Sequence, residues 1–590
     1  MKTSKKSHII LAAALMAAPV TFADELNQVI EVEKQVEVVE QKADKMPAMP
    51  EAMPVVARNI NLNFSDWTIP AEIDPSLVTQ SPDRYNDGFR FLRKRGYASF
   101  GMGNYLNMVG SAGFRIIDKE NTLLNVWMQH NSTDGTIDNR TKFATDDRFR
   151  LEFGHDFYKG RLGINAGYKL NKFNYYGSLY YSPDTKRQIA NNGSLNLSWL
   201  SQPTDNGLQY YVDLGYNYFA HGNGLPLSET RPYEFMDEGL TENNILAKVG
   251  ASLTWNDYSH VGLDAEVQWD KYSNLPVYGQ HSDSPEPVIM ATNKSLAMFS
   301  ATPYYAKTTD RMNLRIGARL DISHNNGTVF RIAPDVKFGY IFTDRVSLEA
   351  SATGGNRLNS YYTLAARNLY ASTLMWNTRT FTQLDAEVRL NIGEWGGFRF
   401  SPYFGYAIVK DALTPSVIRY MQNDQTFVNH FSDRLGMVRY SGFDRNGLKM
   451  GIDMGWKFRE LLELKAGYAF MPQEYDSGYA LADDRAEHTV SASLKITPIK
   501  PLDIYVDYQL RAGRYVNVTT IFDANPSLLP NAGMENLGNI SNLGFGVTYR
   551  FFDWLHAYAQ GSNLLNRRVY DYYGMLSQRA TFLIGVGVSF

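Results

Sequence analysis

The sequence predicts an all-β protein, a transmembrane antiparallel β-barrel of about 22 strands with short periplasmic turns and long extracellular loops. Three observations support this fold class. Many segments alternate apolar and polar residues over about ten positions, which is the span that a tilted strand needs to cross the hydrocarbon core. Short turns alternate along the chain with longer connections. The last segment alternates in the same way and ends on an aromatic residue, Phe590.

The composition excludes several other classes. Of the 590 residues, 44% are hydrophobic and 13% aromatic, with 46 Gly and 38 Tyr, as expected of strands with one lipid-facing and one polar face. The net charge of -3 gives no basic field, so no nucleic-acid partner is predicted. The chain has no Cys, which removes disulfides, thiolate metal sites and a Cys nucleophile. We predict no enzymatic activity, no cofactor and no metal site, because the histidines are dispersed without a ligand-type spacing.

The N-terminal part divides into two segments. Lys2, Lys5 and Lys6 precede the apolar run 9–20, and small residues end at Ala23, which predicts a Sec signal peptide over 1–23. Residues 24–93 are rich in charge, Pro and Met and predict an irregular periplasmic or lumen-lining segment. The barrel is expected over 94–590.

Three segments show the strand pattern most clearly: 260–270, 311–322 and 502–511. In each, Val, Ile, Leu and aromatic residues occupy one face and charged or small residues the other. A strand of this length with two unlike faces fits a wall between lipid and a polar lumen.

Turn spacing predicts the topology. Ten short turns rich in Asp, Asn and Gly join twenty strands, and a first strand near 95–104 and the terminal strand bring the total to about 22, an even number with both ends periplasmic. The predicted turns are 118–121, 159–160, 203–206, 256–257, 309–310, 343–344, 393–396, 459–460, 499–501 and 553–554. The longer connections are predicted to be polar extracellular loops, chiefly 222–240, 273–292, 358–377, 413–446 and 514–539. Residues 434–441 also have a strand pattern.

The polar faces of the predicted strands carry charges of both signs. We expect these residues to line the lumen, either as the mixed charges of a wide polar interior, the interpretation that we favour, or as a selectivity lining. The candidates are Arg315, Arg319, Arg389, Asp264, Glu266, Asp503 and Asp507.

The terminal strand resembles the signal by which the barrel assembly machinery recognises its clients. Its apolar face consists of Phe582, Ile584, Val586, Val588 and Phe590. Before it, residues 558–568 read YAQGSNLLNRR. This segment resembles the final hairpin of TonB-dependent receptors, in which an Asn-Leu-x-Asn-Arg type segment leads into the last strand. The short N-terminal segment around 26–32 and the first strand at 96–104 are further similar to plugless TonB-receptor-like barrels of Bacteroidota.

This resemblance implies an outer-membrane barrel of a Gram-negative bacterium that takes part in the transport of a solute or polymer. Residues 24–93 are too few for a plug, and no clear TonB box is present, so TonB is not predicted as a partner. The expected partners are outer-membrane lipid and the assembly machinery. The alternative hypothesis is a structural or assembly scaffold that holds a surface lipoprotein or another outer-membrane subunit.

Overall fold

The computed structural model describes residues 94–590 except 177–186, 205, 224–225, 229–230, 236–238, 257, 274–294, 325–326, 373–378, 423–424, 428–437, 476–485 and 523–530. The predicted signal peptide over 1–23 and the segment 24–93 lie outside the described residues. Within the described part no helix is long and apolar enough to cross a membrane.

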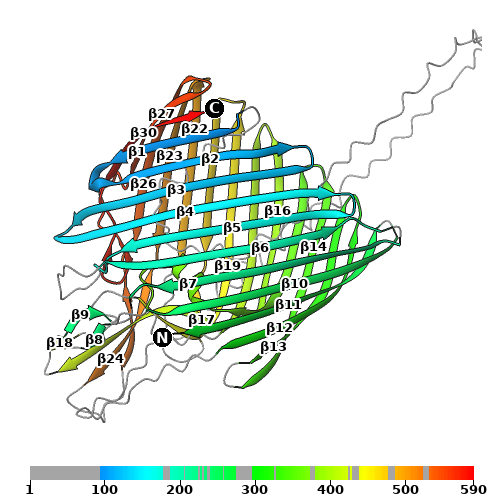
Figure 1. The fold of residues 1–590 in the computed structure, drawn as a ribbon, viewed down its shortest axis with the longest axis horizontal. Coiled ribbons are helices and arrows are strands. Elements are labelled where there is room, and N and C mark those ends of the chain that lie inside the picture. The colour runs from blue at the N-terminus through cyan, green and yellow to red at the C-terminus, as the bar shows by residue number, and fades with distance from the viewer. Residues whose placement is uncertain are drawn as a thin grey trace, which may run out of the picture. The chain divides into compact units, whose positions relative to one another are not determined.

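The chain forms a closed antiparallel barrel of 22 strands, which confirms the predicted fold class (Figure 1). The strands follow one another around the wall in chain order. They are β1 Gly96–Gly103, β2 Met108–Lys119, β3 Thr122–Ile137, β4 Arg140–Phe157, β5 Gly160–Phe173, β6 Gln188–Ser201, β7 Leu208–His221, β10 Thr241–Asn256, β11 Ser259–Ser273, β12 Leu296–Thr308, β13 Met312–His324, β14 Thr328–Thr343, β15 Val346–Leu358, β16 Arg379–Trp395, β17 Phe398–Gln422, β19 Arg439–Phe458, β20 Leu462–Phe470, β22 His488–Ile499, β23 Leu502–Ala512, β26 Ile540–Phe552, β27 Leu555–Ser562 and β30 Thr581–Ser589.

The barrel closes between the first and last strands. β1 pairs antiparallel with β30 from Tyr97 opposite Ser589 to Gly103 opposite Leu583. Just beyond the paired residues, the backbones of Gly96 and Phe590 exchange two hydrogen bonds of 2.8 and 2.9 Å. The seam therefore has no open edge where β1 meets β30.

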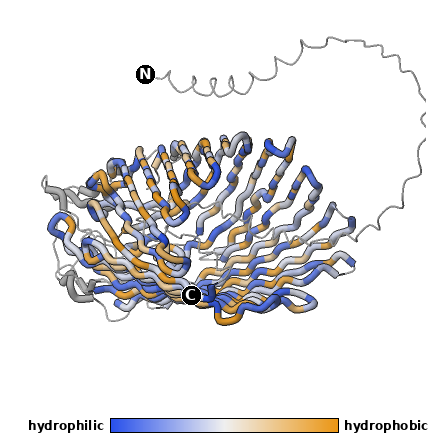
Figure 2. Tube along the Cα trace, turned by 90° about the horizontal axis from the view of Figure 1, so that it is seen from above, coloured by the Kyte–Doolittle hydropathy of each residue, from blue (hydrophilic) through white to orange (hydrophobic). Residues whose placement is uncertain are grey.

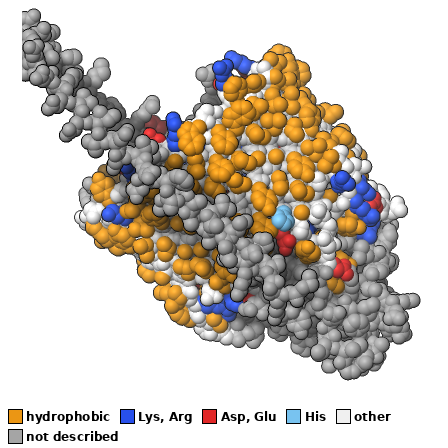
Figure 3. All heavy atoms as spheres, turned by 180° about the vertical axis from the view of Figure 1, so that it is seen from behind, with side chains coloured by type: hydrophobic (Ala, Val, Ile, Leu, Met, Phe, Trp, Pro, Cys, Tyr) orange, Lys and Arg blue, Asp and Glu red, His pale blue; other side chains and the backbone are white. Residues whose placement is uncertain are grey.

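The outward face of the wall is apolar. On β11 the exposed fractions of Val261, Leu263 and Trp269 are 40%, 50% and 40%, whereas the side chains that alternate with them face inward. Figure 2 shows the same alternation of hydrophobic and hydrophilic residues along the strands, and Figure 3 shows hydrophobic side chains covering much of one outer face. Exposed apolar side chains in this number are stable only against lipid, so the predicted orientation of the strand faces is confirmed.

Aromatic side chains gather at the short-turn end of the barrel. Tyr158, at the turn between β4 and β5, is 96% exposed. Others at this end are Phe157, Trp255, Tyr258, Phe342, Trp395, Phe398, Phe458, Phe551, Phe552 and Trp554. Aromatic rings of this kind favour the boundary between hydrocarbon and headgroups, so this rim marks the periplasmic interface of the membrane.

All ten predicted short turns join strands close to the positions expected. The predicted bounds of the loop 413–446 are wrong at both ends, because β17 continues to Gln422 and β19 begins at Arg439. The strand that the pattern at 434–441 suggests is confirmed in part, because β19 includes residues 439–441. Small elements occupy the longer connections: η3 Asn104–Leu106, β8 Pro226–Ser228, β9 Arg231–Phe235, α2 Tyr361–Arg367, β18 Gln425–Phe427, β21 Gln473–Tyr475, β24 Tyr515–Phe522, β25 Asn531–Asn536, β28 Tyr570–Tyr572 and β29 Met575–Leu576.

Candidate functional site

The connection between β15 and β16 folds inward instead of forming a solvated loop. We call its described part, residues 359–372, the α2 loop. Helix α2 begins after Ser360, whose hydroxyl accepts a hydrogen bond of 3.1 Å from the backbone N–H of Thr363. This N-cap satisfies one of the free N–H groups at the start of the helix. A carboxylate from the barrel wall satisfies two more.

That carboxylate is Glu242, near the extracellular end of β10. Its two oxygens accept hydrogen bonds from the backbone N–H groups of Tyr361 at 3.0 Å and Tyr362 at 2.7 Å. The Glu242 side chain is fully buried. Strands β11 to β14 lie between β10 and the strand from which the α2 loop starts. Glu242 therefore fixes the loop to a distant part of the wall.

Aromatic contacts extend this docking. The ring centroid of Tyr370 lies 5.5 Å from that of Phe173 and 5.5 Å from that of Tyr176, both at the extracellular end of β5. On the other side of the loop, the backbone of Val438 forms a parallel bridge with Ala371, with hydrogen bonds of 2.8 Å on both sides. The α2 loop thus crosses the mouth of the barrel and is held on both sides.

A second connection, residues 563–580 between β27 and β30, also folds inward, and we call it the C-terminal loop. Arg140 donates to the carbonyl oxygen of Gly574 at 2.8 Å, and Tyr176 donates to that of Leu576 at 3.1 Å. The guanidinium of Arg514, whose side chain is fully buried, donates to the carbonyl oxygens of Tyr570 and Asp571. These donors come from the connections at β4, β5 and β23, so they hold the loop from several directions.

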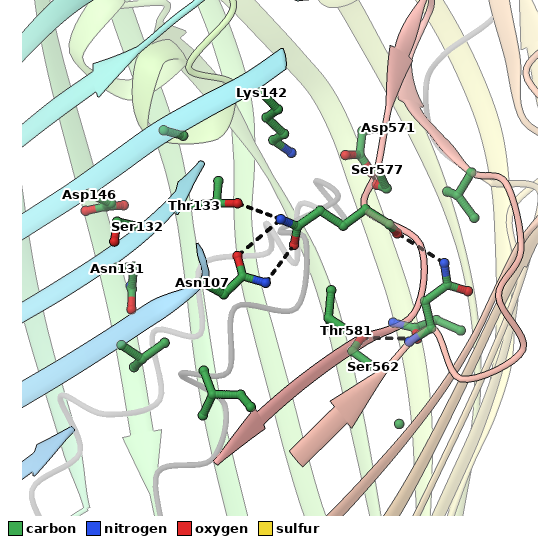
Figure 4. Close-up of a pocket in the computed structure, with 18 of the residues that line it drawn as sticks. Asn107, Asn131, Ser132, Thr133, Lys142, Asp146, Ser562, Asp571, Ser577 and Thr581 are labelled. Atoms are coloured by element: carbon green, nitrogen blue, oxygen red, sulfur yellow. Dashed lines mark hydrogen bonds between the residues drawn. The ribbon is translucent and has the colours of Figure 1, made fainter. Parts of the chain in front are cut away.

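Gln578 connects the C-terminal loop to the barrel wall at β2 and β3, next to the seam. Its side-chain amide exchanges two hydrogen bonds of 3.1 Å with the amide of Asn107, and its Nε2 donates to the hydroxyl of Thr133 at 2.6 Å. Figure 4 shows Asn107 and Thr133 pointing toward the loop, with these hydrogen bonds as dashed lines. The paired amides satisfy each other, which favours this one docked position of the loop.

The two loops share one hydrophobic cluster. Tyr361 and Leu364 from the α2 loop belong to the same buried cluster as Tyr572 and Met575 from the C-terminal loop. Phe173, Tyr175, Tyr176, Phe219 and Tyr440 complete its aromatic part. Burying apolar side chains from separate loops together stabilises both loops in the inward position. They form a roof over part of the lumen.

One acidic side chain of this roof is buried. Asp571 accepts a hydrogen bond from the hydroxyl of Ser577. Burial raises the pKa of the Asp571 carboxyl, and the positive charge of Lys142 opposes this shift. A carboxyl that is costly to ionise in the docked loop makes docking sensitive to pH.

Beneath the roof lies a cavity of about 840 Å³. Its barrel lining follows one side of the wall across the seam, from β22, β23, β26 and β27 through β30 and β2 to β3, β4 and β5. Amide and hydroxyl side chains are frequent in its lining: Asn107, Asn131, Ser132, Thr133, Thr145, Asn171, Asn368, Ser493, Gln509, Asn542, Gln560, Ser562, Asn563, Ser577, Gln578 and Thr581. Its volume lies in the range of sites that hold small organic ligands. Several of these side chains are seen around the cavity in Figure 4.

The structure pairs four of the predicted lumen residues on β11 and β13. Arg315 bridges Asp264 and Asp335, each at 2.8 Å, and its guanidinium lies 3.6 Å from the ring centroid of Tyr304. In the next layer Arg319 approaches Glu266 at 3.8 Å. Opposite charges from β11, β13 and β14 neutralise one another here, and Asp264, Glu266, Arg315 and Arg319 do not line the cavity.

The other three predicted residues lie elsewhere on the wall. Arg389 on β16 pairs with Glu387 at 3.3 Å and Asp453 at 2.7 Å. Asp503 is almost fully buried and pairs with Arg550 and with Lys495, which itself lines the cavity. Of the seven predicted residues, only Asp507 is part of the cavity lining that the structure describes.

The sequence-based prediction missed the roof. We predicted 358–377 as a polar loop, and this was wrong, because Tyr361, Tyr362, Leu364, Leu369 and Tyr370 are packed against or within the buried cluster. That density of large apolar residues in a supposed extracellular loop was the available signal. Glu242 carried no such signal, since its role depends on a helix far along the chain.

The closed wall, apolar belt, aromatic rim and polar interior define a 22-strand transmembrane β-barrel. Among solved structures, the chain is similar to the siderophore receptor PirA from Acinetobacter baumannii, with a TM-score of 0.61 and 11% identity over 84% of this chain and 80% of that one. The copper transporter OprC matches with a TM-score of 0.59 and 13% identity over 84% and 81%. The pyoverdine outer membrane receptor FpvA from Pseudomonas aeruginosa PAO1 matches with a TM-score of 0.59 and 13% identity over 84% and 78%. No protein-family model and no curated protein sequence matches the chain.

Proposed function

We propose that this protein carries a polar solute across the outer membrane of a Gram-negative bacterium, through a barrel that has no separate plug and is closed on the outside by its own loops. The observation that carries the proposal is the docking of the α2 loop and the C-terminal loop over a polar cavity. The likeness in fold to outer-membrane receptors and a transporter supports a role in transport. TonB has no assigned role in this proposal, and we infer no catalytic activity.

A liposome-swelling assay tests the proposal. Purified full-length protein is compared with a variant in which residues 361–371 are replaced by a short Gly-Ser linker. We expect little swelling with the natural chain and rapid swelling with the variant, because removal of the α2 loop opens the roof. Equal, low permeability of both proteins, together with normal growth of a deletion strain on all solutes tested, would count against transport.

A scaffold for other outer-membrane subunits is the second candidate function. It is favoured by the outer end of β17, which pairs in parallel with β24 from Ser416 opposite Asn517 to Met421 opposite Phe522. β17 has 25 residues, more than a tilted strand needs to cross the membrane, so this pair forms an extension of the wall. Affinity purification from gently solubilised membranes tests the scaffold role, and a barrel that is always recovered alone removes its support.

Two further roles belong to the proposal. The barrel assembly machinery would recognise the apolar face of β30, since the side chains of Phe582, Ile584 and Phe590 are all more than half exposed. The paired charges around Arg315 and Arg389 would fill a wide polar interior and fix the strand register without selecting the solute.

A further inference from the structure

Two acidic side chains of the wall are buried where the α2 loop docks. They are Glu242 on β10 and Asp270 on β11, and both are 0% exposed. They lie at the extracellular ends of these strands, beyond Ile245 and Trp269, which pair with each other and are the outermost exposed apolar residues of the two strands. A tryptophan at such a position marks the edge of the membrane, so both acids lie outside the membrane-spanning part of the wall.

The two acids are diagonal neighbours in the sheet. Glu242 pairs with Tyr272 across the strands, and Asn244 pairs with Asp270. Asp270 accepts hydrogen bonds from the Nδ2 of Asn244 and, at 3.3 Å, from the hydroxyl of Tyr272. The same hydroxyl also stabilises the charge of Glu242. Because a phenol has a single proton to donate, Tyr272 cannot fully satisfy two carboxylates at once.

Among the described residues, no basic side chain compensates these two acids. The neighbouring strand β7 ends at His221, whose burial lowers its pKa to about 4 and leaves the ring neutral. Lys271 follows Asp270 in the chain but is exposed on the other face of β11. The basic residue of helix α2, Arg367, lies at the end of the helix away from Glu242. The phenols of Tyr272 and Tyr361 carry no charge at neutral pH.

This arrangement favours one negative charge and one proton on the pair. Burial raises the pKa of both carboxyls, and the charge of Asp270 raises the pKa of Glu242 further. The backbone N–H groups of Tyr361 and Tyr362 act in the opposite direction on Glu242, because they stabilise a carboxylate there. A second buried charge has no such support, so a proton neutralises it.

Undocking of the α2 loop removes the cause of this protonation. Water then reaches both carboxyls, and the proton passes to water whenever the pH lies above the ordinary pKa of a carboxyl. Groups whose pKa is raised in the docked state stabilise docking in full below their ordinary pKa, and this stabilisation is lost as the pH rises through the raised values.

We propose that Glu242 and Asp270 form a proton switch for the roof: the pair holds one proton while the α2 loop is docked and releases it to water when the loop undocks, so that alkaline conditions open the barrel. The switch rests on the proposed transport function, since it regulates access to the same lumen. Asp270 acts through Glu242 and positions the loop without contacting the solute.

Thiol labelling of the full-length protein in lipid bilayers tests the switch. Ala371→Cys places a thiol at a buried position of the α2 loop, 9% exposed, and Thr328→Cys places one at an exposed position on β14; the chain has no other cysteine. The ratio of the two labelling rates with a maleimide cancels the titration of the thiol itself. We expect this ratio to rise at least tenfold from about pH 5 to about pH 9, because a tenfold difference in proton affinity between the docked and undocked loop changes the open-to-closed ratio tenfold. A ratio that does not change with pH would overturn the proposal.

Three variants assign the effect to the pair. Asp270→Asn removes the second acid, so the rise should become smaller and Ala371→Cys should be labelled more slowly at about pH 9, whereas a damaged fold would be labelled faster. Asp335→Asn is the matched control, because Asp335 is a wall carboxylate that pairs with Arg315 at 2.8 Å, and it should behave like the natural chain. An equally flat profile for Asp335→Asn would overturn the role of the pair. The same holds if Asp571→Asn removes the rise and Asp270→Asn leaves it, because the C-terminal loop would then carry the pH dependence.

Failure of the switch can be told apart from failure of the transport role, because labelling measures the loop and needs no solute. If the variant lacking the α2 loop swells liposomes but the labelling ratio does not change with pH, the switch is wrong and transport stands. If the ratio rises as expected but that variant does not swell liposomes, the loop is pH-sensitive and the transport role is wrong.

Discussion

Removing the Glu242 carboxylate should open the roof of the barrel. In Glu242→Ala the N–H groups of Tyr361 and Tyr362 lose the acceptors now at 3.0 and 2.7 Å. An ordinary intramolecular hydrogen bond contributes about 1 kcal/mol net, so the pair contributes about 2 kcal/mol to docking. Since 1.4 kcal/mol is a tenfold change, the open-to-closed ratio of the α2 loop should rise by about thirtyfold.

Single-channel recording in planar bilayers measures this change. We expect Glu242→Ala to open far more often than the natural chain, and Glu242→Gln, which keeps one acceptor oxygen, to lie between them. Glu349→Gln is the control, since Glu349 accepts a hydrogen bond of 2.8 Å from Asn391 on the neighbouring strand and does not contact either loop. If Glu242→Ala and Glu349→Gln conduct alike while replacement of the α2 loop opens the channel, Glu242 does not hold the loop.

Three more predictions concern the C-terminal loop and the seam. Gln578→Ala loses three hydrogen bonds to Asn107 and Thr133, so proteolysis of intact cells should cut this loop faster, as about 2 kcal/mol of docking is lost. Because burial raises the pKa of the Asp571 carboxyl, docking is favoured in acid and weakens as pH rises through that raised value. Conductance should therefore increase with pH, and Asp571→Asn should reduce this increase. Phe590→Ala should lower the amount of folded barrel in the outer membrane, measured by heat-modifiable gel mobility, whereas Phe582→Tyr should not.

The barrel wall could be predicted from the sequence because its signals are local. The alternation in 311–322 and turns such as Thr309-Asp310 depend only on neighbouring residues. Ten such turns, with the first and last strands, predict about 22 strands, and this even number is consistent with both ends lying on one side of the membrane.

The cavity could not be predicted in the same way. The bonds from Glu242 to helix α2 join residues 119 and 120 positions apart, and those from Gln578 to Asn107 and Thr133 join residues 471 and 445 positions apart. No periodicity encodes such pairs. The charged residues on β11 and β13 were found because they alternate with apolar ones, but alternation could not show that they neutralise one another away from the cavity.

The account depends most on the claim that the inward-folded loops close the extracellular mouth. A disulfide between Ala371→Cys and Val438→Cys tests it, because their bridged backbones lie within disulfide reach and the chain has no other cysteine. Single-channel conductance of this pair in the Glu242→Ala background should be low when oxidised and should rise on addition of a reductant. An equal current before and after reduction, with the crosslink confirmed by mass spectrometry, would contradict the claim.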